Sequence, residues 1–215
     1  MASNFFGADG PLNKFADVFV GVFVTGLLTV LMCVPVITIG PALTSGYYTM
    51  TKVVRHHEGY LLKSFFKSLL LNLRASFFSW LLYLAAIAAL IFDIVYMNAA
   101  NGSSGYIFTG VFIAIGAIML MNICFFYIEL SRFNMKGFEL FKFSMLTMFR
   151  HFPSALIVGA MIAGAFYLGY RTLWGIFIFP GLALYGSTFV MERVLLKYMP
   201  EPEEGSEEAE KWYYK

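Results

Sequence analysis

Long apolar runs alternate with short basic stretches along the chain. A helix that crosses ~30 Å of hydrocarbon needs ~20 largely apolar residues, because every backbone amide must find its hydrogen bond within the segment. The pattern therefore predicts an all-α protein, a polytopic transmembrane helical bundle of about five spans. The five apolar windows are Asp17–Ile37, Phe77–Met97, Ile107–Ile128, Pro153–Tyr170 and Thr172–Glu192. The last two are separated by little more than Arg171, which fits either a tight hairpin or one long, broken helix pair.

Two stretches between the spans carry apolar residues at helical spacing. Between Gly59 and Ser76, leucines and phenylalanines recur every three or four positions, and Lys63 and Lys67 fall on the opposite side. Residues 139–152 repeat the pattern more weakly. We interpret both as amphipathic helices in the cytoplasmic membrane interface; for the first, packing against the rest of the chain is the alternative. Each leads into two spans, so we interpret the chain as one lead span followed by two degenerate repeats.

The positions of the basic residues predict the orientation of the spans. Cytoplasmic loops of membrane proteins are enriched in Lys and Arg. With five spans, all 15 of these residues except Lys14 and Arg171 fall on one side. We therefore expect the N-terminus outside and the C-terminus in the cytoplasm. The chain is expected to divide into a transmembrane helical domain, residues 1–199, and an acidic cytoplasmic tail, residues 200–215, which has too few apolar residues to build a core.

The composition supports lipid as the solvent and excludes several classes of protein. Hydrophobic residues make up 60% of the chain and charged residues 13%, against about 25% charged residues in soluble domains. A net charge of +2 gives no basic surface for nucleic acid. Cys33 and Cys124 lie singly in apolar runs and form neither a disulfide framework nor a zinc site. No cationic stretch precedes the first apolar window, so we expect this span to be retained.

No catalytic or cofactor-binding motif is present. The sequence contains no phosphate-binding loop, no H-E-x-x-H pair and no G-x-S-x-G turn. We therefore expect a protein that is not an enzyme and that has no cofactor and no metal.

Few polar residues lie inside the apolar windows. Asp93 is the one carboxylate well within a span, and such a residue is a candidate for contact with an ion or substrate. Its place near the outer end of the span also fits a structural role in which it reaches interfacial water. Asn122 is a second candidate, with hydrogen bonding between helices as the alternative.

Two glutamates mark span ends on the predicted cytoplasmic side. Glu129 is followed closely by Arg132, and Glu192 directly by Arg193. Charges paired in this way usually anchor a helix end at the interface, so we interpret both glutamates as anchors.

The first third of the chain resembles a known family. The stretches that carry the resemblance are Pro35–Thr44, Tyr47–Tyr48, Lys52–Arg55, Glu58–Tyr60 and Phe65–Lys67, together with the opening Phe5–Gly7 and Gly10–Pro11. They resemble the YesL-like family of small bacterial integral membrane proteins. The resemblance implies a protein of the bacterial cell membrane with an accessory role in carbohydrate uptake, because members of that family are often encoded near sugar-import ABC transporters. It implies no catalytic residues.

Two hypotheses for function follow. The first is a non-enzymatic accessory or regulatory subunit that contacts the lipid bilayer and the permease subunits of a carbohydrate ABC importer. The second is a small secondary transporter built from two helical-hairpin repeats, with Asp93 and Asn122 near its path; the scarcity of intramembrane polar residues counts against it. For the first hypothesis, the candidate partner contacts are Pro35, Thr38, Gly40, Pro41, Thr44, Tyr47, Phe65, Phe66 and Lys67. The sequence determines neither the sugar nor the oligomeric state.

Overall fold

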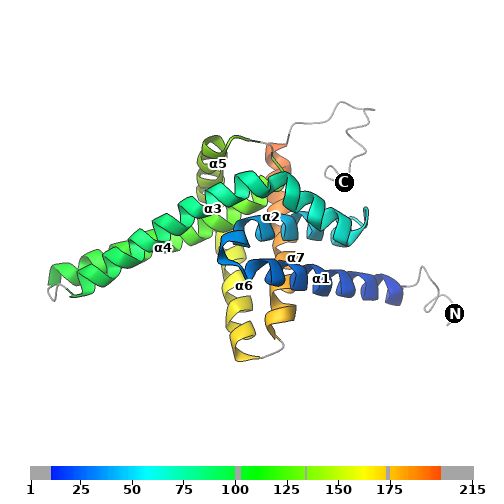
Figure 1. Cartoon of the computed structure of the whole chain (residues 1–215), viewed down its shortest axis with the longest axis horizontal. Helices are drawn as coiled ribbons and strands as arrows, with labels where there is room; N and C mark the ends of the chain where they lie inside the picture. Colours follow the sequence, from blue (N-terminus) through cyan, green and yellow to red (C-terminus); the bar gives the residue numbers. More distant parts are fainter. Residues whose placement is uncertain (1–10, 100–102, 134, 173–174, 200–215) are drawn as a thin grey trace.

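The computed structural model describes residues 11–99, 103–133, 135–172 and 175–199, and these ranges contain helices and no strand (Figure 1). The acidic tail lies outside them. The prediction of an all-α fold is confirmed. The helices are α1 (Pro11–Cys33), α2 (Ile39–Thr49), α3 (Leu61–Ala99), α4 (Ser103–Leu130), α5 (Gly137–Arg150), α6 (Phe152–Arg171) and α7 (Gly175–Leu195), with short helical turns η2 (Val36–Thr38), η3 (Met50–Arg55) and η4 (Leu196–Tyr198).

Five of the described helices are long and apolar enough to cross a membrane, which confirms the predicted number of spans. They are α1, α3, α4, α6 and α7, the last extended by η4. Large apolar side chains are exposed along all five, so their outer faces suit contact with the lipid bilayer. The chain is a multi-pass membrane protein. The last two apolar windows form a hairpin of α6 and α7, which settles the choice that the sequence left open.

The helices are arranged around α2 (Figure 1). In this view the hairpin of α3 and α4 runs towards the lower left, the hairpin of α6 and α7 points downwards, and α1 crosses α7. α2 packs against α1, α3, α4 and α7, and α5 packs against the ends of α4 and α6. We call this packed region, where α2 meets α3, the ends of α4 and α7, and α5, the junction. Most of the buried apolar side chains lie in two clusters within it.

The predicted interface helix between Gly59 and Ser76 is not a separate element. Residues 61–99 form one continuous helix of 39 residues, because no Gly or Pro interrupts them. At 1.5 Å per residue, α3 is about 58 Å long, well beyond the ~30 Å of a hydrocarbon core. We call residues 61–76 the entry segment of α3. The second amphipathic stretch does form its own helix, α5, which ends at Arg150 before the Pro at position 153.

The entry segment packs on the chain through small polar residues. Its buried side contains Ser64, Phe65, Ser68 and Ser76. A Cβ at Gly40 of α2 would lie 2.7 Å from the carbonyl oxygen of Ser76, so only glycine permits this approach. The opposite side leaves apolar residues exposed: Leu62, Phe66, Leu70, Leu71 and Leu73. Packing against the rest of the chain therefore accounts for the serine side of this segment and leaves the leucine side uncovered.

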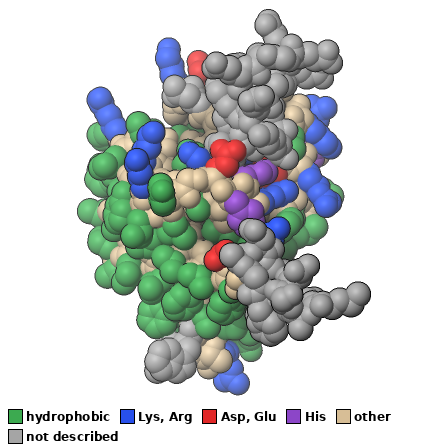
Figure 2. Space-filling model, turned by 90° about the vertical axis from the view of Figure 1, so that its right-hand side faces the viewer, with side chains coloured by type: hydrophobic (Ala, Val, Ile, Leu, Met, Phe, Trp, Pro, Cys, Tyr) green, Lys and Arg blue, Asp and Glu red, His purple; other side chains and the backbone are tan. Residues whose placement is uncertain are grey.

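The surface combines a broad apolar area with local basic groups. Figure 2 shows one face on which apolar side chains cover most of the left and lower parts, whereas most Lys and Arg side chains lie in the upper half and along the right-hand edge. This separation is typical of a protein that contacts lipid with one zone and water or headgroups with another.

Candidate functional site

The interior of the junction is built on α2, a helix buried almost all round. Eight of its residues are buried, and several carry hydroxyl groups. Two of these hydroxyls bond to their own helix: Thr44 donates to the Gly40 carbonyl at 3.1 Å, and Ser45 donates to the Pro41 carbonyl at 2.8 Å. Since such bonds satisfy the side chains locally, α2 can lie among four other helices without polar partners on each of them.

Tyr47 connects α2 to an ion pair between α4 and α7. Its hydroxyl donates to Glu192 Oε1 at 3.1 Å. Arg132, in the turn after α4, donates from Nε to the same oxygen at 3.2 Å and from Nη2 to Glu192 Oε2. The side chains of Arg132 and Glu192 are only 2% and 5% exposed, and Tyr47 is fully buried. Three segments far apart in the sequence therefore meet at one carboxylate.

The arrangement keeps Tyr47 in the role of a neutral donor. Burial and the negative charge of Glu192 hold the pKa of its hydroxyl well above the ordinary value of 10.0. Arg132 forms two parallel bonds to the carboxylate, the geometry in which a guanidinium binds carboxylates most strongly. Each of these three side chains is bonded to another of the three, so we assign the cluster a positioning role.

Glu129 and Glu192, which we interpreted as anchors at the membrane interface, are both buried within the chain. Glu192 is buried and pairs with Arg132, across 60 positions of sequence, instead of with its neighbour Arg193. Glu129 is fully buried, and neither of its carboxylate oxygens has a hydrogen-bond partner among the described residues. Neither side chain lies at an exposed interface.

Asn122 belongs to a second polar chain across three helices. It accepts a bond from the Tyr83 hydroxyl of α3 at 2.6 Å and donates to Ser144 Oγ of α5 at 3.0 Å. Its side chain is 1% exposed. Both ends of the amide are thus used between helices. Asp93 is far along α3, half-buried, and makes no ion pair within the described ranges.

The candidate partner contacts divide into buried and exposed residues. The side chains or backbone of five are buried within this chain: Gly40, Pro41, Thr44, Tyr47 and Phe65. Thr38 is half-buried and bonds to the Pro35 carbonyl at 2.8 Å. Only Pro35, Phe66 and Lys67 are exposed.

The exposed candidates do not form one patch. Pro35 lies in the turn beside Val36, whose carbonyl accepts a bond from the Trp80 indole at 2.6 Å. Phe66 precedes Trp80 by 14 residues, about 21 Å along a straight helix. A partner surface around Phe66 and Lys67 would therefore consist of the entry segment of α3 without the turn at Pro35.

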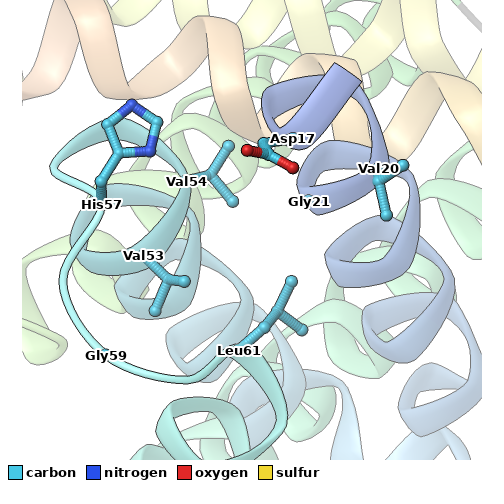
Figure 3. A pocket seen from close by; sticks show the side chains of 8 residues that line it. All are labelled: Asp17, Val20, Gly21, Val53, Val54, His57, Gly59 and Leu61. Carbon is cyan, nitrogen blue, oxygen red and sulfur yellow. The ribbon is translucent and has the colours of Figure 1, made fainter. Parts of the chain in front are cut away.

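An open cavity lies between α1, η3 and the start of α3 (Figure 3). Its volume is about 270 Å³, and its lining is mostly apolar, with Asp17 and His57 as its ionisable groups. His57 and Gly59 shape the wall with φ angles of 55° and 88°. The described residues contain no group of three His, Cys, Asp or Glu side chains that could hold a metal ion. One acid and one histidine in an open hollow provide no specific chemistry.

Comparison with known proteins identifies one similar family. Residues 19–94 match the family described as "Protein of unknown function, DUF624", a membrane-protein family. No curated protein and no solved structure matches the chain. The matched segment runs from within α1 through α2 and most of α3, so it includes Tyr47 and Phe66 but not Arg132 or Glu192. This part of the chain is therefore similar to a membrane-protein family of unknown function.

Proposed function

We propose that the chain is a non-enzymatic accessory or regulatory protein of the bacterial cell membrane, which binds a membrane-embedded partner through the entry segment of α3. The observation that carries the proposal is the uncovered apolar side of this segment, with Leu62, Phe66 and Leu70 exposed. Lys63 and Lys67 are exposed on the same segment. α3 is too long for all of it to lie in hydrocarbon, so part of this apolar side needs another cover.

The class of partner follows from the resemblance to the YesL-like family. That resemblance favours the permease subunits of a carbohydrate ABC importer. The polar side chains of the junction support a binding role over transport, because Asn122, Tyr47 and Glu192 are all bonded within the chain. A packed junction and an exposed apolar surface on one chain suit a binding protein.

Substitutions at two exposed positions of the entry segment test the proposal. Phe66 is 41% exposed, so Phe66→Glu should leave the fold intact while placing a charge on the apolar surface. Lys63→Gln is the matched control, because Lys63 is exposed on the same helix. We expect Phe66→Glu to abolish co-purification of ABC permease subunits from mild detergent and Lys63→Gln to retain it, with the melting temperatures of both near that of the parent. Equal recovery of the permease with both variants would refute the proposed surface.

The proposed orientation has the N-terminus outside and the junction on the cytoplasmic side. After replacement of Cys33 and Cys124, single cysteines introduced as Lys67→Cys and Tyr170→Cys test it, because Lys67 is exposed and Tyr170 is 91% exposed. A reagent that does not cross the membrane should label the cysteine at position 170 in intact cells and not the one at position 67. Labelling at position 67 and not at position 170 would show that the chain has the opposite orientation in the membrane.

The transporter remains the second candidate because Asp93 lies within α3 without an ion-pair partner in the described ranges. An accessory protein tolerates Asp93→Asn, since no ion is carried on that carboxylate. Solute uptake by purified protein in liposomes, abolished by Asp93→Asn, would establish the transporter instead.

A further inference from the structure

Glu129 is a buried acid that nothing in the proposed function uses. It lies next to the last residue of α4 and is fully buried. Both of its carboxylate oxygens lack a hydrogen-bond partner among the described residues. Glu192 lies near the end of α7, but its two oxygens are bonded by Arg132 and Tyr47. Two similar carboxyl groups at one junction therefore have opposite environments.

The side chain that faces Glu129 from α5 is Thr147. The Thr147 hydroxyl lies 2.8 Å from the Phe143 carbonyl, to which it donates, so its single proton cannot serve Glu129 at the same time. While the bond to Phe143 is in place, Thr147 offers the Glu129 carboxylate no donor, and a proton or a cation on that carboxylate would compensate its charge.

The other ionisable groups of the junction are already engaged. From α3, the Tyr83 hydroxyl donates to Asn122 at 2.6 Å. From the turn after α4, Arg132 contacts Glu192, and from α2 the Tyr47 hydroxyl does the same. The buried residues of α5 and α6 carry no charge: Leu140, Ser144, Thr147, Met148, Ala155, Val158 and Ala165. The Arg132–Glu192 ion pair does not include Glu129.

We propose that Glu129 binds a cation at the α4–α5 junction, either a proton or a small monovalent ion such as Na⁺ shared with the Thr147 oxygen. An isolated carboxylate in an apolar interior is strongly unfavourable, and either occupant removes that penalty. Hard oxygen donors suit Na⁺. The site offers one negative charge, because the charge of Glu192 is balanced by Arg132, so a monovalent occupant matches it and a divalent ion does not.

The two occupants give different thermal unfolding profiles. If the occupant is a proton, the native state binds more protons than the unfolded state at neutral pH, so the melting temperature of the parent falls as pH rises. If it is Na⁺, the melting temperature at alkaline pH rises with Na⁺ concentration and saturates, as mass action requires. The measurement uses the full chain in nanodiscs, with choline replacing Na⁺ at constant ionic strength.

Glu129→Gln should remove whichever dependence the parent shows, because the amide is neutral and nearly isosteric. Glu139→Gln, at an exposed position of α5, is the matched control and should behave as the parent. Thr147→Val should weaken the Na⁺ response and leave a proton response in place. Identical pH and Na⁺ profiles for the parent and Glu129→Gln would overturn the proposal.

Infrared spectroscopy keeps the proposal testable if Glu129→Gln does not fold. A proton on Glu129 gives the carbonyl band of a carboxylic acid in the parent, and the band should persist in Asp93→Asn, which removes another of the carboxylates within the spans. Bound Na⁺ instead shifts the carboxylate bands on exchange with choline. The absence of both signals in the folded parent would overturn the proposal.

Discussion

Replacing Glu192 with glutamine should destabilise the junction more than any other single polar substitution in it. The change preserves the shape of the side chain and removes its charge. Arg132, 2% exposed, would then lose the carboxylate to which it is bonded, and the Tyr47 hydroxyl would lose its charged acceptor. The ion pair joins the end of α4 to the end of α7, so its loss loosens the contact between the two hairpins.

The size of this loss in stability depends on the charge that remains buried after the substitution. Removing one partner of a buried ion pair costs about 3–5 kcal/mol, because the other charge stays desolvated. Tyr47→Phe removes one hydrogen bond to a charged acceptor and leaves the ion pair intact, so it should cost about 1.5–3 kcal/mol. The double variant Arg132→Gln/Glu192→Gln removes both charges together and should recover most of the loss caused by Glu192→Gln alone.

Reversible unfolding in mixed micelles, titrated with SDS and followed by tryptophan emission, measures these free energies. The expected order of stability is parent, then Tyr47→Phe and the double variant, then Glu192→Gln. Arg193→Gln is the control, because Arg193 is adjacent in sequence and exposed, and it should change stability by less than about 0.5 kcal/mol. If Glu192→Gln is as stable as Arg193→Gln, the ion pair does not hold the hairpins together.

Two further predictions concern helix packing and pH. A Cβ at Gly26 of α1 would lie 2.7 Å from the Cα of Gly181 in α7, so Gly26→Ala should cost about 1–3 kcal/mol in SDS unfolding. Gly110→Ala, where nothing lies within 4 Å, should be neutral or stabilising, and equal losses would refute the close crossing. Burial and the positive charges of Lys197 and Arg150 lower the pKa of His151 from 6.5. The native state then binds fewer protons than the unfolded state between that lowered pKa and 6.5, so this residue makes stability rise with pH there. His151→Gln should show a smaller rise in melting temperature across this window, and an unchanged slope would contradict the assignment.

The spans were predictable because their signal is local. Length and apolar content locate both ends of α4, α6 and α7 to within four residues, and those of α1 to within six. The first predicted window extends to Ile37, but α1 ends at Cys33. The helix ends there because Pro35 has no amide hydrogen and disfavours helix in the residue before it. The sequence predicted a separate helix for the entry segment because the amphipathic spacing ends near Ser76. Backbone continuity depends on the absence of Gly and Pro, which is why α3 continues unbroken.

The junction was less predictable because its contacts join distant positions. Glu192 has Arg193 beside it in sequence, and only the fold brings Arg132 to it. The available signal was that a glutamate at the end of an apolar window requires a partner, with several cations on the same predicted side. Gly26 and Gly181 carry no such signal. A glycine at a close helix crossing and a glycine that faces open space, such as Gly110, cannot be told apart in the sequence. The burial of Tyr47 was not predictable either, because its partner, Glu192, is 145 positions away in the sequence.

The measurement that tests the central claim most directly is site-specific photocrosslinking in intact membranes. A photoreactive phenylalanine analogue would replace Phe66 on the entry segment of α3, and Phe166 of α6, 76% exposed, would serve as the control position. The account predicts that position 66 crosslinks to an integral membrane subunit of an ABC importer, identified by mass spectrometry, while position 166 crosslinks to lipid. Lipid adducts alone at both positions, or crosslinks from position 66 only to a second copy of this chain, would contradict it.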